Sequence, residues 1–241
     1  MRLKIILSYD GSKFNGFQMQ NSGLPTVANK LGSILKSLGI RTKIRASGRT
    51  DSGVHASGAV IDIEVPPFWS DTDKLKNIMN QKALPDIYIK NIKEVDDSFH
   101  SRFCAKRRVY RYIISIKEPS VFMTPYLFFI SRIDEKIIQE SIKYFEGEHD
   151  FSFFKKSKGG TKSSVRIVYK TRFYRYKDFY IFYFEANGYL RSQIRMMVSF
   201  LLDISNGKLT KKDLKEQLLL KKRHSTDIVI PNGLYLAKIK Y

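Results

Sequence analysis

The first half of the chain alternates strand-like and helix-like hydrophobic patterns. Short runs rich in β-branched and aromatic residues at 4–9 and 87–95 predict strands, and a brief strand is expected at 43–46. In residues 60–65 apolar and polar positions alternate, which predicts a half-buried strand. Apolar residues at helical spacing predict one helix within 27–38 and a second that follows the 60–65 strand. The resulting order, β-α-β-β-α-β, is typical of a ferredoxin-like unit.

The second half repeats this order more loosely. Its strands are predicted at 109–116, 165–176, 179–186 and 234–241, and its helices at 137–145, 190–204 and 209–220. We therefore expect an α+β fold of two ferredoxin-like units, whose antiparallel sheets lie side by side with a cleft between them. The expected domains are residues 1–104 and 105–241, and the last strand is expected to close the second domain.

The chain is strongly basic. It has 43 Lys and Arg residues against 23 Asp and Glu residues, which gives a net charge of +20 and a pI near 9.9. Such an excess favours a polyanionic partner, and nucleic acid is the first candidate. A membrane surface is the competing partner, but the sequence has no apolar run long enough to span a bilayer and no basic amphipathic helix with an obvious anchor.

The cysteine, the histidines and the missing glycine-rich motifs limit the compartment and the kinds of site that we expect. Cys104 is the only cysteine, which fits a reducing compartment, and the apolar part of residues 1–7 is too short for a signal peptide, so we expect a cytoplasmic protein. The four histidines are scattered, and none lies at a metal-ligand spacing with Cys104. Phosphate-loop and dinucleotide-binding motifs are also missing from the sequence, so we expect neither a metal nor a cofactor.

One stretch, residues 46–56, is the best candidate for an active-site loop. It holds a single carboxylate, Asp51, between Gly48 and Gly53. Glycine allows backbone conformations closed to other residues, so this span is consistent with a tight loop that presents one acid. However, Asp and Gly are also common in surface turns. From these residues alone, an ordinary surface turn is a commoner structure than an active-site loop.

The motif GRTDSGVHA at residues 48–56 resembles the GRTDAGVHA signature of the TruA family of tRNA pseudouridine synthases. In that family the aspartate is the catalytic nucleophile, and the match places it on Asp51. Ser52 stands where the family usually has alanine, whereas both glycines and Arg49 are retained. As a nucleophile or base Asp51 must be ionised, and a nearby arginine lowers the pKa of a carboxyl group; Arg49, close in sequence, is one candidate for this role, and we expect it among the substrate-binding residues.

Two further segments resemble the same family. Residues 188–198 are similar to its F-L-x-H-M-V-R-N-M-V helix, whose arginine pairs with the catalytic aspartate, and the match places that arginine on Arg195. Residues 105–112 are similar to its A-x-x-x-x-Y-R-Y strand, whose first tyrosine, here Tyr110, packs on the target base. Without the motifs, a solvated helix arginine and an ordinary core tyrosine would be the simpler interpretations. Weaker matches in the family's order extend the resemblance over most of the chain, at residues 9–20, 80–87, 99–103, 147–151 and 231–236.

The resemblance implies a pseudouridine synthase fold and an isomerase that converts uridine to pseudouridine at positions 38, 39 and 40 of the tRNA anticodon stem-loop. It also implies a homodimer whose subunits share one tRNA. Basic clusters at 102–111, 155–162, 170–177 and 208–223 would suit such a partner. Two alternatives stay open: a pseudouridine synthase with other RNA targets, and a non-catalytic RNA-binding or chaperone module on the same fold.

Overall fold

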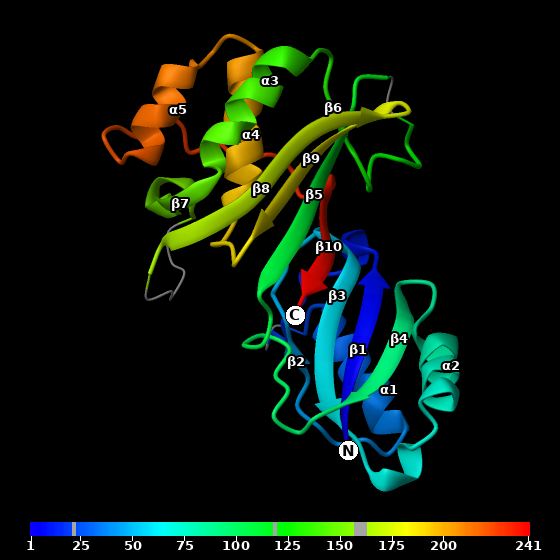
Figure 1. The fold of residues 1–241 in the computed structure, drawn as a ribbon. Helices are drawn as coiled ribbons and strands as arrows, with labels where there is room; N and C mark the ends of the chain where they lie inside the picture. The colour runs from blue at the N-terminus through cyan, green and yellow to red at the C-terminus, as the bar shows by residue number, and fades with distance from the viewer. Residues whose placement is uncertain (21–22, 118–119, 157–162) are drawn as a thin grey trace. The chain divides into compact units, whose positions relative to one another are not determined.

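The computed structural model describes residues 1–20, 23–117, 120–156 and 163–241 (Figure 1). These form two compact units, one of residues 1–106 with 235–241 and the other of residues 107–234. The final strand, which the sequence pattern assigned to the second half, is therefore grouped with the first unit. Local hydrophobic patterning predicts that a strand exists but does not say with which strand it pairs.

The first unit has the expected ferredoxin-like arrangement. Its strands run in the order β4-β1-β3-β2, and all three pairings are antiparallel. Strand β10 (Leu234–Lys240) adds a parallel pairing to β3, in which Tyr235 lies opposite His55. The elements are β1 (Arg2–Tyr9), α1 (Val27–Ser37), β2 (Arg45–Ala46), β3 (His55–Glu64), α2 (Thr72–Ala83) and β4 (Ile87–Val95), with short 3-10 turns at Gly11–Lys13 and Pro67–Trp69.

Both helices of the first unit begin at side-chain caps. The Thr26 hydroxyl accepts from the amide of Asn29 at 3.1 Å, and the Asp71 carboxylate accepts from the amide of Lys74 at 2.8 Å. Each cap satisfies an amide that the first helical turn cannot bond internally. The two helices pack against each other, and α2 also packs on β4.

Strand β3 is more deeply buried than its alternating pattern predicts. Val60 and Asp62, expected on a solvated face, are buried, and Asp62 is fully inaccessible. The Asp62 carboxylate lies 2.7 Å from Arg45 Nε and 3.6 Å from Arg2 Nη1, and it accepts from the amide of Ser101 at 2.8 Å. The prediction of a half-buried strand was wrong because residues 99–101 and the two arginine side chains cover the polar face.

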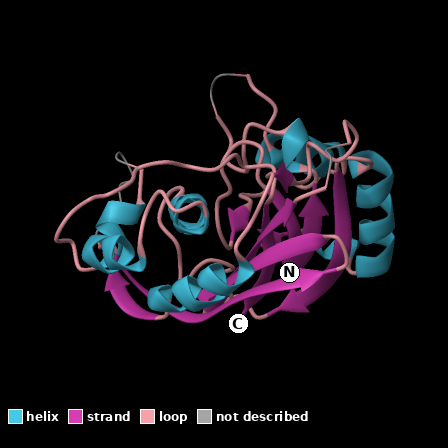
Figure 2. Cartoon of the chain, turned by 90° about the horizontal axis from the view of Figure 1, so that it is seen from above, coloured by secondary structure: helices cyan, strands magenta, loops and turns pink. Residues whose placement is uncertain are grey.

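The second unit is also an α+β structure. Its strands run in the order β5-β9-β8-β7 with antiparallel pairing, and a short β6 pairs parallel to β5. Its helices lie over one face of the sheet (Figure 2). The elements are β5 (Arg107–Ser115), β6 (Phe128–Phe129), α3 (Glu135–Ser141), β7 (Gly147–Asp150), β8 (Val165–Tyr176), β9 (Phe179–Ala186), α4 (Gln193–Ser205) and α5 (Lys211–Leu218), with 3-10 turns at Ile142–Phe145 and Phe151–Phe154.

Aromatic side chains form much of the core of this unit. Fully buried rings come from β9, α4 and the 3-10 turns, and several meet edge to face at centroid distances of 5.5–6.5 Å. This geometry is the favoured one for aromatic pairs. The strand predicted at 109–116 is confirmed as β5, where Tyr110, Tyr112 and Ile114 on one face are buried, and so are Val109 and Ser115 on the other. The α+β class with two sheet-based units is thus confirmed.

Within the residues that the structure describes, no helix has the length and apolar character needed to span a lipid bilayer.

Candidate active site

Asp51 lies in the first unit, on the loop that joins β2 to β3. Its side chain is half-buried, and its carbonyl accepts from the amide of Val54 at 3.2 Å, which closes a turn. The amide of Gly53 donates to the carbonyl of Phe14 at 3.3 Å, and the amide of Phe17 donates to the carbonyl of Thr50 at 3.2 Å. Backbone bonds to residues 14–17 therefore hold the loop on both sides of the carboxylate.

Glycine is required where this loop meets the segment after β1. Gly53 has φ +76°, a left-handed conformation that side chains disfavour. Gly16 has φ +91°, and a Cβ there would come within 2.8 Å of the carbonyl of Thr50. At Gly11 a Cβ would collide with the carbonyl of Val54. The conformation of the Asp51 loop thus depends on close backbone packing, which is more than a surface turn would need.

His55, four residues after Asp51, has a positioning role that the sequence analysis did not assign. The residue is buried, and its Nδ1 accepts from the amide of Gly11 at 3.0 Å. Its ring stacks on Tyr235 of β10 at a centroid distance of 4.7 Å and an interplanar angle of 18°. His55 therefore ties the end of the loop to the β1 turn and to β10. In the sequence, the only indication of this role was that His55 lies inside the GRTDSGVHA motif.

Arg49 lies on the same loop, two residues before Asp51, and is exposed. Thr50, between them, points inward instead, where its hydroxyl is 2.8 Å from the Tyr9 hydroxyl. The loop thus alternates an outward cation, an inward anchor and the half-buried carboxylate. This geometry is compatible with Arg49 contacting a ligand that approaches Asp51.

Tyr110 lies in the second unit, on β5 opposite Phe184 of β9. It is buried, with 9% of its surface exposed, and its ring meets that of Tyr189 edge to face at 5.3 Å and 84°. The Tyr189 hydroxyl is itself buried, and burial holds its pKa well above the usual value. The ring of Tyr110 is therefore held in one orientation by a neutral aromatic neighbour.

Arg195 lies in the first turns of α4 and is half-buried. Its Nε donates to the carbonyl of Val229 at 2.7 Å. The residue that precedes the helix, Ser192, adopts a left-handed conformation with φ +59°. The arginine that the motif singled out is therefore held by a backbone bond to a distant segment, and it is not a freely solvated side chain.

The segment 229–233 joins Arg195 to the tyrosine strand. The Tyr112 hydroxyl donates to the carbonyl of Ile230 at 2.8 Å, and the amide of Ile113 donates to the carbonyl of Gly233 at 2.8 Å. A Cβ at Gly233 would approach the carbonyl of Ile113 to 2.5 Å, so only glycine fits. This packing explains why residue 233, within the matched segment 231–236, is a glycine.

The predicted site residues are thus divided between the units. Asp51 and Arg49 belong to the first unit, and Tyr110 and Arg195 to the second, where one hydrogen-bonded framework supports both. The functional pairing of Asp51 with Arg195 stays a prediction. The predicted basic cluster at 155–162 falls mainly on residues 157–162, which lie outside the described residues.

Two other features of the second unit have some of the attributes of a binding site. Asp213, Glu216 and His224 bring ligand-type atoms within 4.8 Å of one another. However, His224 Nε2 lies 2.8 Å from Glu216 and Nδ1 lies 3.3 Å from Asp213, whose other oxygen caps α5 through Thr210. The arrangement is explained as an imidazole held between two carboxylates, which fixes the chain after α5.

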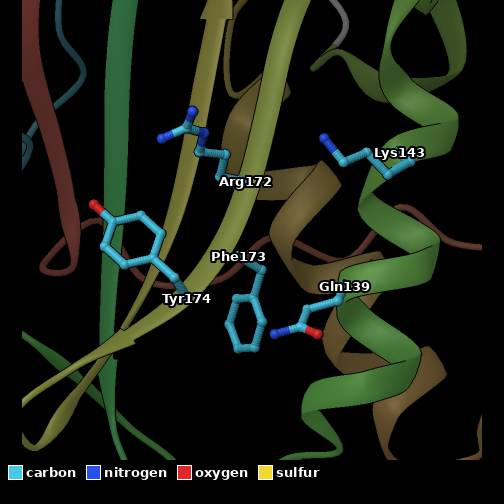
Figure 3. Close-up of a pocket in the computed structure, with 5 residues that line it drawn as sticks. All are labelled: Gln139, Lys143, Arg172, Phe173 and Tyr174. Carbon is cyan, nitrogen blue, oxygen red and sulfur yellow. The ribbon is translucent and has the colours of Figure 1, made fainter.

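A pocket of about 290 Å³ lies between β8 and the α3 region (Figure 3). The Lys143 ammonium at its edge already bonds to Glu146 at 2.8 Å and to the carbonyl of Thr171 at 2.7 Å. None of the predicted site residues lines the pocket, which is formed by Gln139, Lys143, Arg172, Phe173 and Tyr174. It therefore gives no support to a second catalytic centre.

The fold and the loop define an α+β protein of two sheet-based units, the first of which presents a carboxylate on a tightly packed loop. The family model described as tRNA pseudouridine synthase matches residues 5–104 and 141–241. The chain is 42% identical over 241 residues to tRNA pseudouridine synthase A of Campylobacter jejuni, with 100% of both chains covered. It is 37% identical to the protein of that name from Helicobacter hepaticus and 36% identical to the one from Phytoplasma mali, with 99% of this chain and 98% of each relative covered. The chain belongs to the tRNA pseudouridine synthase family, a class of isomerases that act on uridine in tRNA.

Proposed function

We propose that this chain converts uridine to pseudouridine at positions 38, 39 and 40 of the tRNA anticodon stem-loop. The observation that supports the proposal most strongly is the full-length identity of 42% to a tRNA pseudouridine synthase A. In this chain, Asp51 lies on a loop held by backbone hydrogen bonds to residues 14–17. In the reaction the N1–C1′ bond breaks, the base turns, and C5 bonds to C1′. The proton lost from C5 balances the one gained at N1, so the reaction needs no redox partner.

Asp51 is assigned as the group that starts the reaction. It acts either as a nucleophile that adds covalently or as a base that removes a proton from the sugar. Both routes need an ionised carboxylate, and a nearby guanidinium favours that form. We assign this electrostatic role to Arg195. Its bond to the carbonyl of Val229 limits the positions that the guanidinium can take.

Tyr110 is assigned to the target base. The uridine must leave its stack, which costs a few kcal/mol, and a flat apolar partner offsets part of that cost. The edge-to-face contact with Tyr189 keeps the Tyr110 ring in a single orientation. Arg49, exposed on the Asp51 loop, is assigned to the RNA backbone next to the target.

The partner and location follow from the substrate. A net charge of +20 suits tRNA, and the basic side chains at 170, 172, 175, 177, 208 and 221–223 are exposed. We propose that the protein acts as a homodimer in the cytoplasm, with two subunits sharing one tRNA. Sedimentation of the full chain with and without tRNA tests the dimer, and a monomer under both conditions would contradict it.

The function is tested in a strain that lacks this enzyme. Wild type and Ser52→Ala, which changes an exposed neighbour to the residue usual in the family, are expected to restore pseudouridine in tRNA. Asp51→Asn is expected to lose at least about 100-fold in kcat because the nucleophile is removed. Position-resolved mapping of pseudouridine in the recovered tRNA provides the measurement.

Two outcomes would contradict the proposal. Restoration by Asp51→Asn as complete as by wild type would remove the catalytic assignment of Asp51. Restoration at positions outside 38–40 would keep Asp51 as the catalytic residue but change the target.

A further inference from the structure

The second unit carries an ordered apolar turn that the proposed reaction does not use. In this turn, Ser120–Thr124, the side chains of Val121 and Phe122 are 77% and 83% exposed. The amides of Met123 and Thr124 both donate to the carbonyl of Ser120, at 2.8 and 3.0 Å, and the amide of Phe122 donates to the Ser120 hydroxyl at 3.3 Å. The turn therefore holds its two large apolar side chains out in solvent next to each other, where a partner could cover them.

The apolar turn is hydrogen-bonded to the segment 229–233, which also holds Arg195. Asn232 Nδ2 donates to the carbonyl of Thr124 at 2.9 Å. Asn232 belongs to the segment 229–233, whose Val229 carbonyl accepts from Arg195. The turn, which lies between β5 and β6, is thus connected through two hydrogen bonds and a few residues to a side chain assigned to the reaction (Figure 1).

Lys117, three residues before the apolar turn in the chain, brings positive charge to the start of that turn. The Lys117 ammonium pairs with Asp178 at 2.8 Å in the turn between β8 and β9. That hydrogen bond lowers the pKa of Asp178, and the charges of Arg175 and Lys177 act in the same direction. Lys117 is thus bonded to Asp178, whereas Arg175 and Lys177 lie close to Asp178 along the chain, and all three cations are exposed. The patch retains an excess positive charge.

We propose that the apolar turn, together with Lys117, Arg175 and Lys177, binds an unpaired stretch of the RNA substrate outside the reacting base. Phe122 stacks on a nucleobase, and the three cations face the phosphates on either side. An exposed aromatic ring beside basic side chains is the combination that single-stranded nucleic acid requires. A second copy of the chain is a poorer occupant, because like charges would oppose each other. The inference rests on the proposed function and names a further contact of the same substrate.

The test uses the full chain and an anticodon stem-loop RNA. Phe122→Ala is expected to raise KM and Kd about 10-fold, the loss of one stacked base, with kcat unchanged. Phe122→Trp is expected to restore both constants, and its fluorescence is expected to fall when RNA is added. Phe122→Leu, which is apolar but cannot stack, is expected to behave as the alanine variant does. Phe68→Ala, which removes a 68% exposed phenylalanine from the first unit, serves as the matched control and is expected to change nothing.

Three results would overturn the inference. The first is a Phe122→Ala variant with wild-type KM and Kd, and the second is full rescue by leucine. The third is a change of oligomeric state in Phe122→Ala with RNA affinity intact, which would make the patch a protein interface. A failure of the proposed function would be seen in a different measurement. The proposed function is tested by turnover in wild type and the loss of turnover in Asp51→Asn, whereas this inference is tested by the Kd for RNA.

Discussion

Asp62 shows how a single charge is accommodated in the core of the first unit. Its carboxylate is fully buried, and isolated buried charges are costly unless they are paired and hydrogen-bonded. Arg45, Arg2 and the amide of Ser101 supply those partners. Because loss of one partner leaves the others buried without compensation, such clusters resist substitution more than their net stabilisation suggests. Asp62 therefore fixes where residues 99–101 lie on the sheet.

Tyr183 on β9 predicts an alkaline limit to stability. Burial raises its pKa to about 12, and the hydrogen bond that its hydroxyl donates to Glu185 acts in the same direction. Because the pKa of Tyr183 is higher in the folded state than in the unfolded state, its protonated hydroxyl contributes fully to the free energy of unfolding below the unfolded pKa near 10. That contribution is lost as the pH rises from 10 towards 12. Tyr183→Phe is therefore expected to flatten the fall in unfolding free energy across that window.

Urea unfolding at a series of pH values, with an ultraviolet titration of tyrosinate, checks this expectation. Tyr174→Phe, a half-buried tyrosine on the adjacent strand β8, is the comparison. The same alkaline slope in wild type and Tyr183→Phe would contradict the assignment.

At the scale of elements, the segment 229–233 has no regular secondary structure, but it is hydrogen-bonded to three other parts of the second unit. It accepts hydrogen bonds from α4 through Arg195 and from β5 through Tyr112, and it is bonded to the apolar turn through Asn232. Because the first two contacts are to backbone carbonyls of the segment, the path of the chain at Val229 and Ile230 matters more than the side chains there. A backbone shift in this segment would disturb several assigned residues together.

Gly233→Ala tests that connection. The added Cβ would meet the carbonyl of Ile113 at 2.5 Å and the Tyr112 ring at 3.0 Å, so the segment must move. We expect a loss of about 1–3 kcal/mol of unfolding free energy and a lower kcat. Gly32→Ala, in an open position on α1, is the control and is expected to be stabilising by up to about 1 kcal/mol. Urea unfolding and single-turnover kinetics measure both, and a stable, fully active Gly233→Ala variant would disprove the connection.

The elements also show where sequence reasoning succeeds. The strand at 87–95, the β8–β9 hairpin and the helices were predicted because their patterns are local. The partner of β10 was not, since strand pairing depends on residues far apart in the chain. Asp62 was misjudged because alternation alone treats a polar position as solvated. The motifs singled out Asp51, Tyr110 and Arg195, but the supporting roles of His55 and of residues 229–233 needed the three-dimensional contacts.

For the whole molecule, the dominant property is the excess of positive charge. A charge of +20 spread over several surface clusters predicts an affinity for tRNA that is largely electrostatic. Neutralising phosphates releases counterions, so binding weakens as salt is added. The reaction proposed for Asp51 would involve few of these charges, so salt is expected to change the Kd for tRNA far more than kcat.

We expect log Kd for tRNA to rise linearly with log salt. For 6–10 phosphate contacts the loss of affinity would be roughly 10³–10⁵-fold between 50 and 200 mM salt. Filter binding across a potassium chloride series gives the slope, and single-turnover kcat at saturating tRNA should stay nearly constant. Asp51→Asn should give the same slope. An affinity independent of salt would contradict a phosphate-dominated interface.

The pairing of β10 with β3 has a consequence for biosynthesis. The first unit is assembled from residues 1–106 and from a strand encoded some 130 residues later. While the nascent polypeptide leaves the ribosome, His55 and Ala56 must wait for Tyr235 and Leu236 before their pairing is complete. The β3 end of the Asp51 loop would therefore complete its strand pairing last, after translation has passed through the entire second unit.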